Sequence, residues 1–319
     1  MADSLNLCKP IVVLSGPTAS GKTALAIQLA QAFNGEIIGG DSLQLYQDLP
    51  ILTARPTHAE MAAAPHHLYG ILKPEQQTSA EEWRTWAMAA IAEVNARGRM
   101  AIICGGTGLY LNTLIDGLSP VPDIPDDTRR FWRDWVARVG AGAAHQHLKS
   151  ADPLMATRLK PSDTQRIARA LEVIEATGVS LAHWQNQPPQ QPGIRSHAVI
   201  CVLDADRMWL MEQCERRFDK MLQDGAAAEV SDLLQTGIAT DAPVFRALGA
   251  RELVAALSGK LAWNVASERA KIVTRQYAKR QLNWNRTQIG TANRFLAQEK
   301  ENLLPEIGNI ITNFRLTAH

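Results

Sequence analysis

The stretch IVVLSGPTASGKTALAIQLA, residues 11–30, decides the fold of this chain. Within it, residues 16–23 match the phosphate-binding pattern G-x-x-x-x-G-K-[ST] at every required position. The β-branched run 11–14 predicts a buried strand before the loop, and residues 24–32 predict a helix after it. Glycines let such a loop curl so that backbone N–H groups point at an anion. A glycine-rich turn without function would not explain why strand, spacing and helix agree.

Two side chains at the end of this loop would act on a bound phosphate. Lys22 adds a mobile positive charge. The Thr23 hydroxyl suits a magnesium ion that bridges phosphate oxygens. We therefore expect Mg²⁺ as the cofactor and Thr23 as its protein ligand. The motif does not indicate which compound carries the phosphate, whether an adenine nucleotide or another molecule.

The first 115 or so residues alternate strand-like and helix-like segments. GEIIGGD, residues 35–41, reads as a short strand, and MAIIC, residues 100–104, as a buried one. Between them, residues 79–98 predict a helix with a Ser79–Glu82 capping box and a glycine stop. This alternation predicts an α/β fold of the P-loop NTPase-like type, a parallel sheet core with helices on both faces.

Two proline-rich segments, 117–127 and 185–196, interrupt the alternation and suit hinges or linkers. The sequence between them reads as helices, and HAVICVLDAD after them looks like a buried strand that rejoins the sheet. We therefore predict a helical insertion domain, 120–196, carried on a core made of residues 1–119 and 197–319. The part of the core beyond residue 206 is expected to be mostly helical.

The composition excludes several classes of protein. The formal net charge is only +1, so contact with a nucleic acid requires a local basic patch. The four cysteines are scattered without a C-x-x-C pair, which argues against a zinc site or a disulfide framework. The opening residues MADSLNLCKP lack an export signal, and no apolar run is as long as a membrane span. We expect a cytoplasmic, monomeric protein that does not bind a membrane.

Asp41 closes the strand GEIIGGD at the edge of the sheet where the phosphate loop also lies. In an enzyme it would be placed to accept a proton from an attacking hydroxyl or amine. The alternative is a helix N-cap, because LQLYQDL follows Asp41-Ser42. Spacing alone does not choose between these two roles.

The strand MAIIC is informative because it lacks a carboxylate at its end. P-loop proteins that hydrolyse ATP hold magnesium through such a carboxylate. Here the strand runs into Cys104 and the glycine turn 105–108, which supplies backbone donors and the Thr107 hydroxyl. We interpret this turn as a second substrate contact; the alternative is a tight turn with no such role. The missing carboxylate weakens the interpretation as an ATPase.

Arg217 lies on the apolar face of a predicted helix, beside Cys214 and Met221. An arginine turned inward needs an anionic partner, since burying a guanidinium alone is costly. That partner would be a phosphate in a functional site. The alternatives are a buried carboxylate and an arginine whose stem alone is buried.

Two basic surfaces are candidates for RNA binding. In residues 268–286, a helical stripe consists of Lys271, Arg275, Lys279, Asn283 and Arg286. A second cluster in the predicted insertion consists of Arg158, Lys160, Gln165, Arg166 and Arg169. Asparagine and glutamine among cations can bond phosphate, sugar or base edges. The alternative for either surface is a solvated helix face.

Together these stretches resemble the bacterial tRNA dimethylallyltransferases, also called tRNA isopentenyltransferases. The resemblance covers roughly residues 11–286 in family order. The motifs that carry it are GPTASGKT, GGDSLQLYQDL, TARPT, PHHL, GGTGLYL, DTQRIARALEVIEATG, the helix around Arg217, and TRQYAKRQLNW. The resemblance implies transfer of a dimethylallyl group from dimethylallyl diphosphate to the exocyclic amine of the tRNA adenosine 3′ of the anticodon.

The resemblance also implies roles for individual residues. Asp41, Thr107 and Arg217 would be catalytic, with Asp41 as the base. The residues implied to bind the diphosphate are Gly16, Pro17, Thr18, Ala19, Ser20, Gly21, Lys22, Thr23 and Arg217. Those expected to contact the tRNA anticodon stem-loop are Asp41, Ser42, Leu43, Gln44, Thr107, Arg129, Gln165, Arg166, Ile167, Ala168 and Arg169, with Arg275 and Lys279 from the basic stripe.

Three positions depart from the family pattern. Arg55 stands where lysine is common, Ala250 replaces an aromatic residue, and Asn283 replaces threonine. Two other functions stay open at this point. A small-molecule or nucleoside kinase would use the same loop with Asp41 as base toward a hydroxyl, and an RNA-binding protein could hold a structural phosphate. The second leaves Asp41 and the inward Arg217 unexplained.

Overall fold

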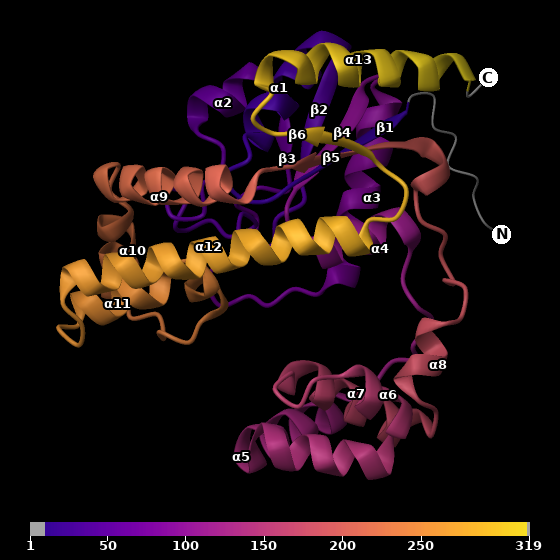
Figure 1. Ribbon diagram of the computed structural model, residues 1–319, viewed down its shortest axis with the longest axis vertical. Coiled ribbons are helices and arrows are strands. Elements are labelled where there is room, and N and C mark those ends of the chain that lie inside the picture. Colours follow the sequence, from indigo (N-terminus) through magenta and orange to yellow (C-terminus); the bar gives the residue numbers. More distant parts are fainter. Residues whose placement is uncertain (1–9, 318–319) are drawn as a thin grey trace. The chain divides into compact units, whose positions relative to one another are not determined.

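A computed structural model describes residues 10–317 of the chain, with only the backbone described at residue 317. Its centre is one sheet in the order β3-β2-β4-β1-β5-β6 (Figure 1). The strands are β1 (Ile11–Ser15), β2 (Gly35–Gly39), β3 (His66–His67), β4 (Met100–Gly105), β5 (Ala198–Asp204) and β6 (Asn293–Leu296). Every neighbouring pair is parallel. The predicted parallel α/β core is confirmed.

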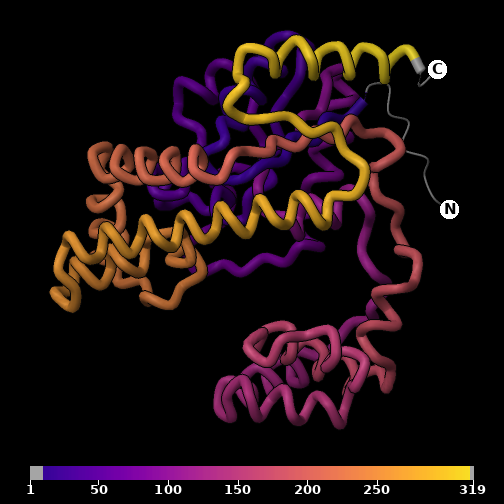
Figure 2. Tube along the Cα trace, in the orientation of Figure 1, coloured from indigo at the N-terminus to yellow at the C-terminus, as the bar shows by residue number. Residues whose placement is uncertain are grey.

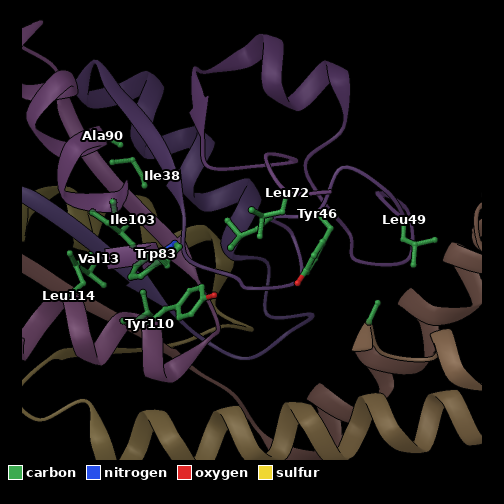
Figure 3. Packing of buried hydrophobic residues seen from close by; sticks show 14 of the residues in the cluster. Val13, Ile38, Tyr46, Leu49, Leu72, Trp83, Ala90, Ile103, Tyr110 and Leu114 are labelled. Atoms are coloured by element: carbon green, nitrogen blue, oxygen red, sulfur yellow. The ribbon is translucent and has the colours of Figure 1, made fainter. Parts of the chain in front are cut away.

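The central strand β1 shows why both faces of the sheet are covered. Its side chains alternate between two separate apolar clusters: Val13 joins one, while Val12 and Leu14 join the other. All three are fully buried. Figure 3 shows the first cluster, in which Val13 and Ile38 lie with side chains of the helices. Strands buried on both faces in this way require helices on both sides.

The helices of the core cover these two faces, and α9 and α12 contribute buried residues to both clusters. They are α1 (Lys22–Phe33), α2 (His58–Ala63), α3 (Ala80–Ala96), α4 (Gly108–Asp116), α9 (Arg207–Gln223), α10 (Ala226–Gln235), α11 (Ala250–Leu257), α12 (Trp263–Gln288) and α13 (Lys300–Thr317). Helices α3 and α4 pack on the first cluster, and α1 and α13 on the second. The tube in Figure 2 shows the C-terminal segment returning to the sheet, where α13 contacts α1.

The predicted helix at 79–98 forms as α3 and keeps its capping box. Ser79 Oγ accepts from Glu82 N at 3.1 Å, and Glu82 Oε2 accepts from Ser79 N at 2.8 Å. Inside the core, Trp83 of α3 stacks on Tyr110 with ring centroids 4.7 Å apart (Figure 3). Trp83 Nε1 also donates to Gly39 O at 2.9 Å. This bond fixes the end of β2, two residues before Asp41.

A second compact unit spans Gly117–Pro192. Its helices are α5 (Asp126–Ala151), α6 (Pro153–Arg158), α7 (Thr164–Thr177) and α8 (Leu181–Gln185). They enclose their own apolar cluster, to which Trp132, Leu148 and Leu171 belong. The predicted insertion, 120–196, overlaps this unit. Residues 193–196 lie with the core instead, where Ile194 N donates to Leu114 O at 3.0 Å.

Two strands were not predicted: β3, which has only two residues, and β6. Residues 293–296 form β6, which pairs with β5 at the edge of the sheet. Its residues alternate between half-buried and exposed, so it lacks the apolar run of a central strand. No helix within the described part of the chain is long and apolar enough to cross a membrane. Residues 1–9, which include Cys8 and most of the stretch MADSLNLCKP, lie outside the described residues.

Candidate active site

The phosphate loop follows β1 with a geometry that suits an anion. Gly21 has φ +85° and Ala19 has φ +64°, so the loop turns through the left-handed region just before α1 begins at Lys22. Gly16 has no room for a side chain, because a Cβ there would lie 2.9 Å from Leu203 Cβ. Such curled backbone presents successive N–H groups to a bound anion.

Lys22 turns back onto the loop that precedes it. Its Nζ donates to Pro17 O at 2.6 Å. Burial lowers the pKa of Lys22 to about 8, against the opposing effect of the nearby Asp41. A bound phosphate would favour the charged form of this lysine, since an opposite charge raises the pKa of an amine. The Lys22 amine is therefore held against the loop by a hydrogen bond to a backbone carbonyl.

Asp41 lies beyond the end of β2 in a turn. Its Oδ1 accepts from Leu43 N at 3.1 Å, and no helix follows it within residues 41–57. The alternative role as a helix N-cap is therefore wrong, because the short bond to residue 43 closes a turn and not the first turn of a helix. Burial raises the pKa of the Asp41 carboxyl, although Lys22 and Arg217 oppose that shift. A carboxylate with a raised pKa is a better proton acceptor.

Thr107 joins the end of β4 to the segment that carries Asp41. Its Oγ1 accepts from Ser42 N at 3.0 Å and lies 3.3 Å from Ser42 Oγ. The two strand ends approach so closely that a Cβ at Gly105 would lie 2.1 Å from Gly40 O. The glycine turn thus places the Thr107 hydroxyl against Ser42, the neighbour of Asp41, and its role as a substrate contact stays a prediction.

Arg217 projects from α9 into the same place. Its Nη1 donates to Thr18 Oγ1 at 3.3 Å, while Cys214 and Phe218 on either side of it are buried. The predicted inward orientation is confirmed. Among the described residues no carboxylate forms an ion pair with Arg217, so the alternative of a buried carboxylate partner is not realised. Burial lowers the pKa of Arg217.

Three of these groups, Thr18 of the phosphate loop, Asp41 and Arg217, line one open cleft, whereas Lys22 and Thr107 are not among its lining residues. Its lining is Thr18, Asp41, Leu43, Leu52, Thr53, Cys214, Arg217, Phe218, Met221, Leu248, Thr274 and Tyr277. The polar end holds the phosphate loop, Asp41 and Arg217, and the rest is largely apolar. Sequence analysis missed the apolar wall. Phe218 and Met221 could have been found from their helical stripe, whereas Leu52 and Leu248 lie in irregular segments without a signal.

Hydroxyl groups at the junction of the phosphate loop and α1 fit a magnesium ion. Ser20 Oγ in the loop is buried and makes no hydrogen bond, and Thr23 follows three residues later in the first turn of α1. Within the described residues, no cluster of carboxylate, histidine and cysteine side chains could hold a metal by itself. Two hydroxyls and the oxygens of a bound phosphate form a donor set that magnesium accepts, because it binds through few protein groups plus phosphates and water.

The basic stripe on α12 is largely neutralised by carboxylates of the core. Lys271 Nζ lies 2.7 Å from Asp219, Arg286 Nη2 lies 2.7 Å from Asp204, and Arg275 pairs with Glu215. Lys279 is exposed and has no acidic partner in the part of the chain that is described. Helices α9 and α12 run side by side here (Figure 1). Of the two predicted contacts on this stripe, Lys279 is the one free to meet phosphate.

The residues of segment 165–169 on α7 also differ in whether they are available to RNA. Gln165 and Arg166 are exposed, but the side chains of Ile167 and Ala168 are buried in the cluster of the helical unit. Buried side chains offer RNA no surface, so the expected contact by Ile167 and Ala168 cannot come from their side chains. Arg169 bonds Glu172 at 3.2 Å.

Two further predicted RNA-contact positions have structural partners. Arg129 lies 3.8 Å from Asp126 on α5. The Nε2 of Gln44 donates to Thr53 O and Ala54 O, which holds the loop after β2. The segment 42–44 is half-buried throughout.

Each departure from the family pattern has a place in the structure. Arg55 Nη1 donates to Tyr46 O and Gln47 O at 3.0 Å, so it too secures the loop after β2. Ala250 is fully buried at the start of α11, where an aromatic ring would need more space. Asn283 is exposed on α12.

Comparisons with known proteins agree on one family. A family model described as IPP transferase matches residues 44–288. The chain is 44% identical over 308 residues to a tRNA dimethylallyltransferase of Parvibaculum lavamentivorans, covering 96% of this chain and 97% of that protein. It is 42% identical to the tRNA dimethylallyltransferase of Rhodospirillum rubrum, covering 97% of this chain and 96% of the relative.

Solved structures give the same result. The full-length tRNA isopentenylpyrophosphate transferase of Bacillus halodurans superposes with a TM-score of 0.70 at 31% identity, covering 98% of this chain and all of that one. A eukaryotic dimethylallyltransferase described as acting on tRNA superposes with a TM-score of 0.75 at 29% identity. That match covers 91% of this chain and 74% of the other.

Proposed function

The chain belongs to the IPP transferase family, and from this premise we propose that it is a tRNA dimethylallyltransferase. It transfers a dimethylallyl group from dimethylallyl diphosphate to the exocyclic amine of the tRNA adenosine that follows the anticodon on its 3′ side. The observation that carries the proposal is the convergence of the phosphate loop, Arg217 and Asp41 on one cleft with an apolar wall. The cradle then holds the diphosphate of a prenyl donor.

At the donor, the bond between the allylic carbon and the diphosphate oxygen breaks, and negative charge grows on the diphosphate. Arg217 already lies against the phosphate loop, where its Nη1 donates to Thr18 Oγ1, so it can stabilise this charge together with N–H groups of the curled loop. Lys22 can exchange its bond to Pro17 O for one to the leaving group. Magnesium bound at Thr23, with Ser20 beside it, would supply further positive charge to the diphosphate.

At the acceptor, the adenine nitrogen forms a bond to the allylic carbon and loses a proton. Asp41 takes that proton, because burial makes its carboxylate more basic. Thr107 stands next to the Asp41 segment and would contact the acceptor. An adenine inside an anticodon loop must turn out of its stack to reach such a cleft. The apolar wall that includes Phe218 and Leu248 suits the dimethylallyl chain.

The kinase alternative is not favoured. Strand β4 ends at Gly105 without the carboxylate that ATP-dependent P-loop enzymes use for magnesium. The similar proteins are named as transferases of prenyl groups to tRNA. A role as an RNA-binding protein without catalysis leaves Asp41 without a purpose in the cleft.

For the tRNA partner, the exposed polar groups are the proposed contacts. Lys279 on α12 and Gln165 and Arg166 on α7 can meet the phosphate backbone of the anticodon stem-loop. We further propose that the protein acts as a monomer in the cytoplasm.

One experiment tests the proposed activity. The purified protein is incubated with radiolabelled dimethylallyl diphosphate and tRNA that lacks the modification, and label in the RNA is counted. We expect labelled RNA that depends on both substrates and on magnesium. Transfer of the γ-phosphate from ATP to a small molecule, without labelling of RNA, would favour the kinase.

A further inference from the structure

The side chain of Gln281 joins the two glycine loops of the cleft. Gln281 comes from α12 and is only 5% exposed. Its Oε1 accepts from Thr18 N in the phosphate loop at 2.7 Å. Its Nε2 donates to Gly106 O in the turn after β4 at 2.8 Å. Both ends of one carboxamide are therefore bonded, each to the backbone of a different loop.

The turn after β4 is shaped to receive this side chain. A Cβ at Gly106 would lie 2.3 Å from Gln281 Nε2, and Gly106 does not have the positive φ that favours glycine. Glycine at 106 is thus needed for space and not for backbone conformation. One turn further along α12, a Cβ at Gly108 would lie 2.2 Å from Trp284 Nε1. Both glycines therefore pack against the same face of α12.

The two loops joined by Gln281 have different tasks under the proposed function. The phosphate loop holds the donor, whereas the turn after β4 carries Thr107, which is bonded to the Asp41 segment that faces the acceptor. Transfer requires the two reacting atoms to be held about 3–3.5 Å apart and aligned. Under the proposed function, the spacing of the two loops would set this distance.

We propose that Gln281 is a positioning residue for prenyl transfer. Its carboxamide fixes the separation of the phosphate loop from the acceptor-side turn, and it does so without touching either substrate. The inference rests on the proposed function, which supplies the two substrates. Loss of the carboxamide leaves each loop intact but lets the distance between them vary. Turnover then falls while binding of the donor diphosphate is largely kept.

A double-mutant cycle tests this role. Gln281→Ala is expected to lower kcat about 10²-fold, the effect of a misplacement near 1 Å, with the KM for the donor changed less than about threefold. Gly106→Ala alone should also lower kcat, because its methyl group displaces the Gln281 amide. In the Gln281→Ala background, adding Gly106→Ala should cost less than a further twofold or so, since residues that share one interaction are not additive.

Control variants separate positioning from stability. Gln276→Ala removes an exposed glutamine from the same helix and should leave kcat unchanged. Gln281→Met keeps a side chain of similar length and removes both polar atoms, so its kcat should match that of Gln281→Ala. Thermal melting of every variant identifies one that fails to fold, and Gln281→Met then stands in for Gln281→Ala.

The outcomes that overturn the inference are distinct from failure of the proposed function. With an active wild-type protein, normal kcat in Gln281→Ala, or losses that multiply across the cycle, would refute the positioning role alone. Absence of prenyl transfer by the wild-type protein would refute the function. In that case amide hydrogen exchange still tests whether Gln281 holds the two loops together. Unchanged protection of residues 16–21 and 105–108 in Gln281→Ala would overturn the positioning role.

Discussion

The phosphate-binding end of the cleft comes mainly from one continuous segment, residues 16–23, with Arg217 added from α9, whereas the acceptor end is assembled from separate parts of the chain. Asp41 follows β2 and Thr107 follows β4. The first end relies mainly on backbone N–H groups, which every residue supplies. The second relies on individual side chains held in place by tertiary contacts. Single substitutions should therefore cost most at the acceptor end.

The largest effect is expected at Asp41. Asp41→Asn should lower kcat by about 10²–10⁴-fold, the contribution of a positioned general base, while donor affinity survives. The pH dependence should follow, because only the deprotonated carboxylate accepts a proton. Since burial raises the pKa of Asp41, kcat/KM should fall on acidification at a pH above the ordinary value of about 3.9. Steady-state rates across pH check this, and a normal rate in Asp41→Asn would remove its role as base.

A substitution at the opposite end of β2 should affect stability and not turnover. Glu36 is buried and bonds Arg97 and His67, and Arg97 above all holds its pKa at about 2. Glu36→Gln should lower the free energy of unfolding, because Arg97 and Arg99 lose the carboxylate that they share; water screens both partly exposed cations, so the loss is smaller than for a fully buried pair. Denaturant unfolding measures this, with the exposed Glu93→Gln as control.

The Glu36 carboxylate should also make the stability of the fold depend on pH. The pKa of Glu36 is lower in the folded state than the unfolded value of about 4.3, so its contribution is full above that pH and is lost as pH falls toward 2. Glu36→Gln should flatten the acid limb of the stability profile. An unchanged limb would show that this cluster does not stabilise the fold.

A substitution at Arg217 tests how one side chain contributes to binding of the diphosphate. Arg217→Gln should weaken donor binding by about ten- to a hundredfold, which is the 1.5–3 kcal/mol of a hydrogen bond to a charged group. Arg216→Gln is a matched control, because Arg216 is exposed on the same helix and lies 3.6 Å from Glu212. Titration calorimetry with the donor measures both. Equal affinities in the two variants would contradict a role for Arg217 at the diphosphate.

The smallest effect is expected at the RNA surface. Lys279→Gln should weaken tRNA binding modestly and lower the slope of log affinity against log salt by about one, the signature of one lost phosphate contact. Arg275→Gln should change the slope less, because Arg275 is already paired with Glu215. Filter binding over a range of salt concentrations compares them. If neither slope changes, the stripe on α12 is a solvated surface.

The contrast between the two ends also explains what the sequence could reveal. The phosphate loop, its strand and its helix are local, so spacing and periodicity were sufficient to predict them. The inward face of α9 was likewise readable from the buried neighbours of Arg217. Gln281 was not, because its partners lie 175 and 263 residues away and no local pattern marks a bridging amide. Strand β6 was not predicted, because an edge strand lacks the buried apolar run of its neighbours.

The central claim is that residues 16–23 grip the departing diphosphate of a prenyl donor. A crystal structure with an unreactive thio-analogue of dimethylallyl diphosphate, in which sulfur replaces the bridging oxygen to carbon, tests it most directly. The account predicts diphosphate density against the loop amides, Lys22 and Arg217, with the prenyl chain on the apolar wall near Phe218. Diphosphate density elsewhere on the protein, with this loop empty, would contradict it.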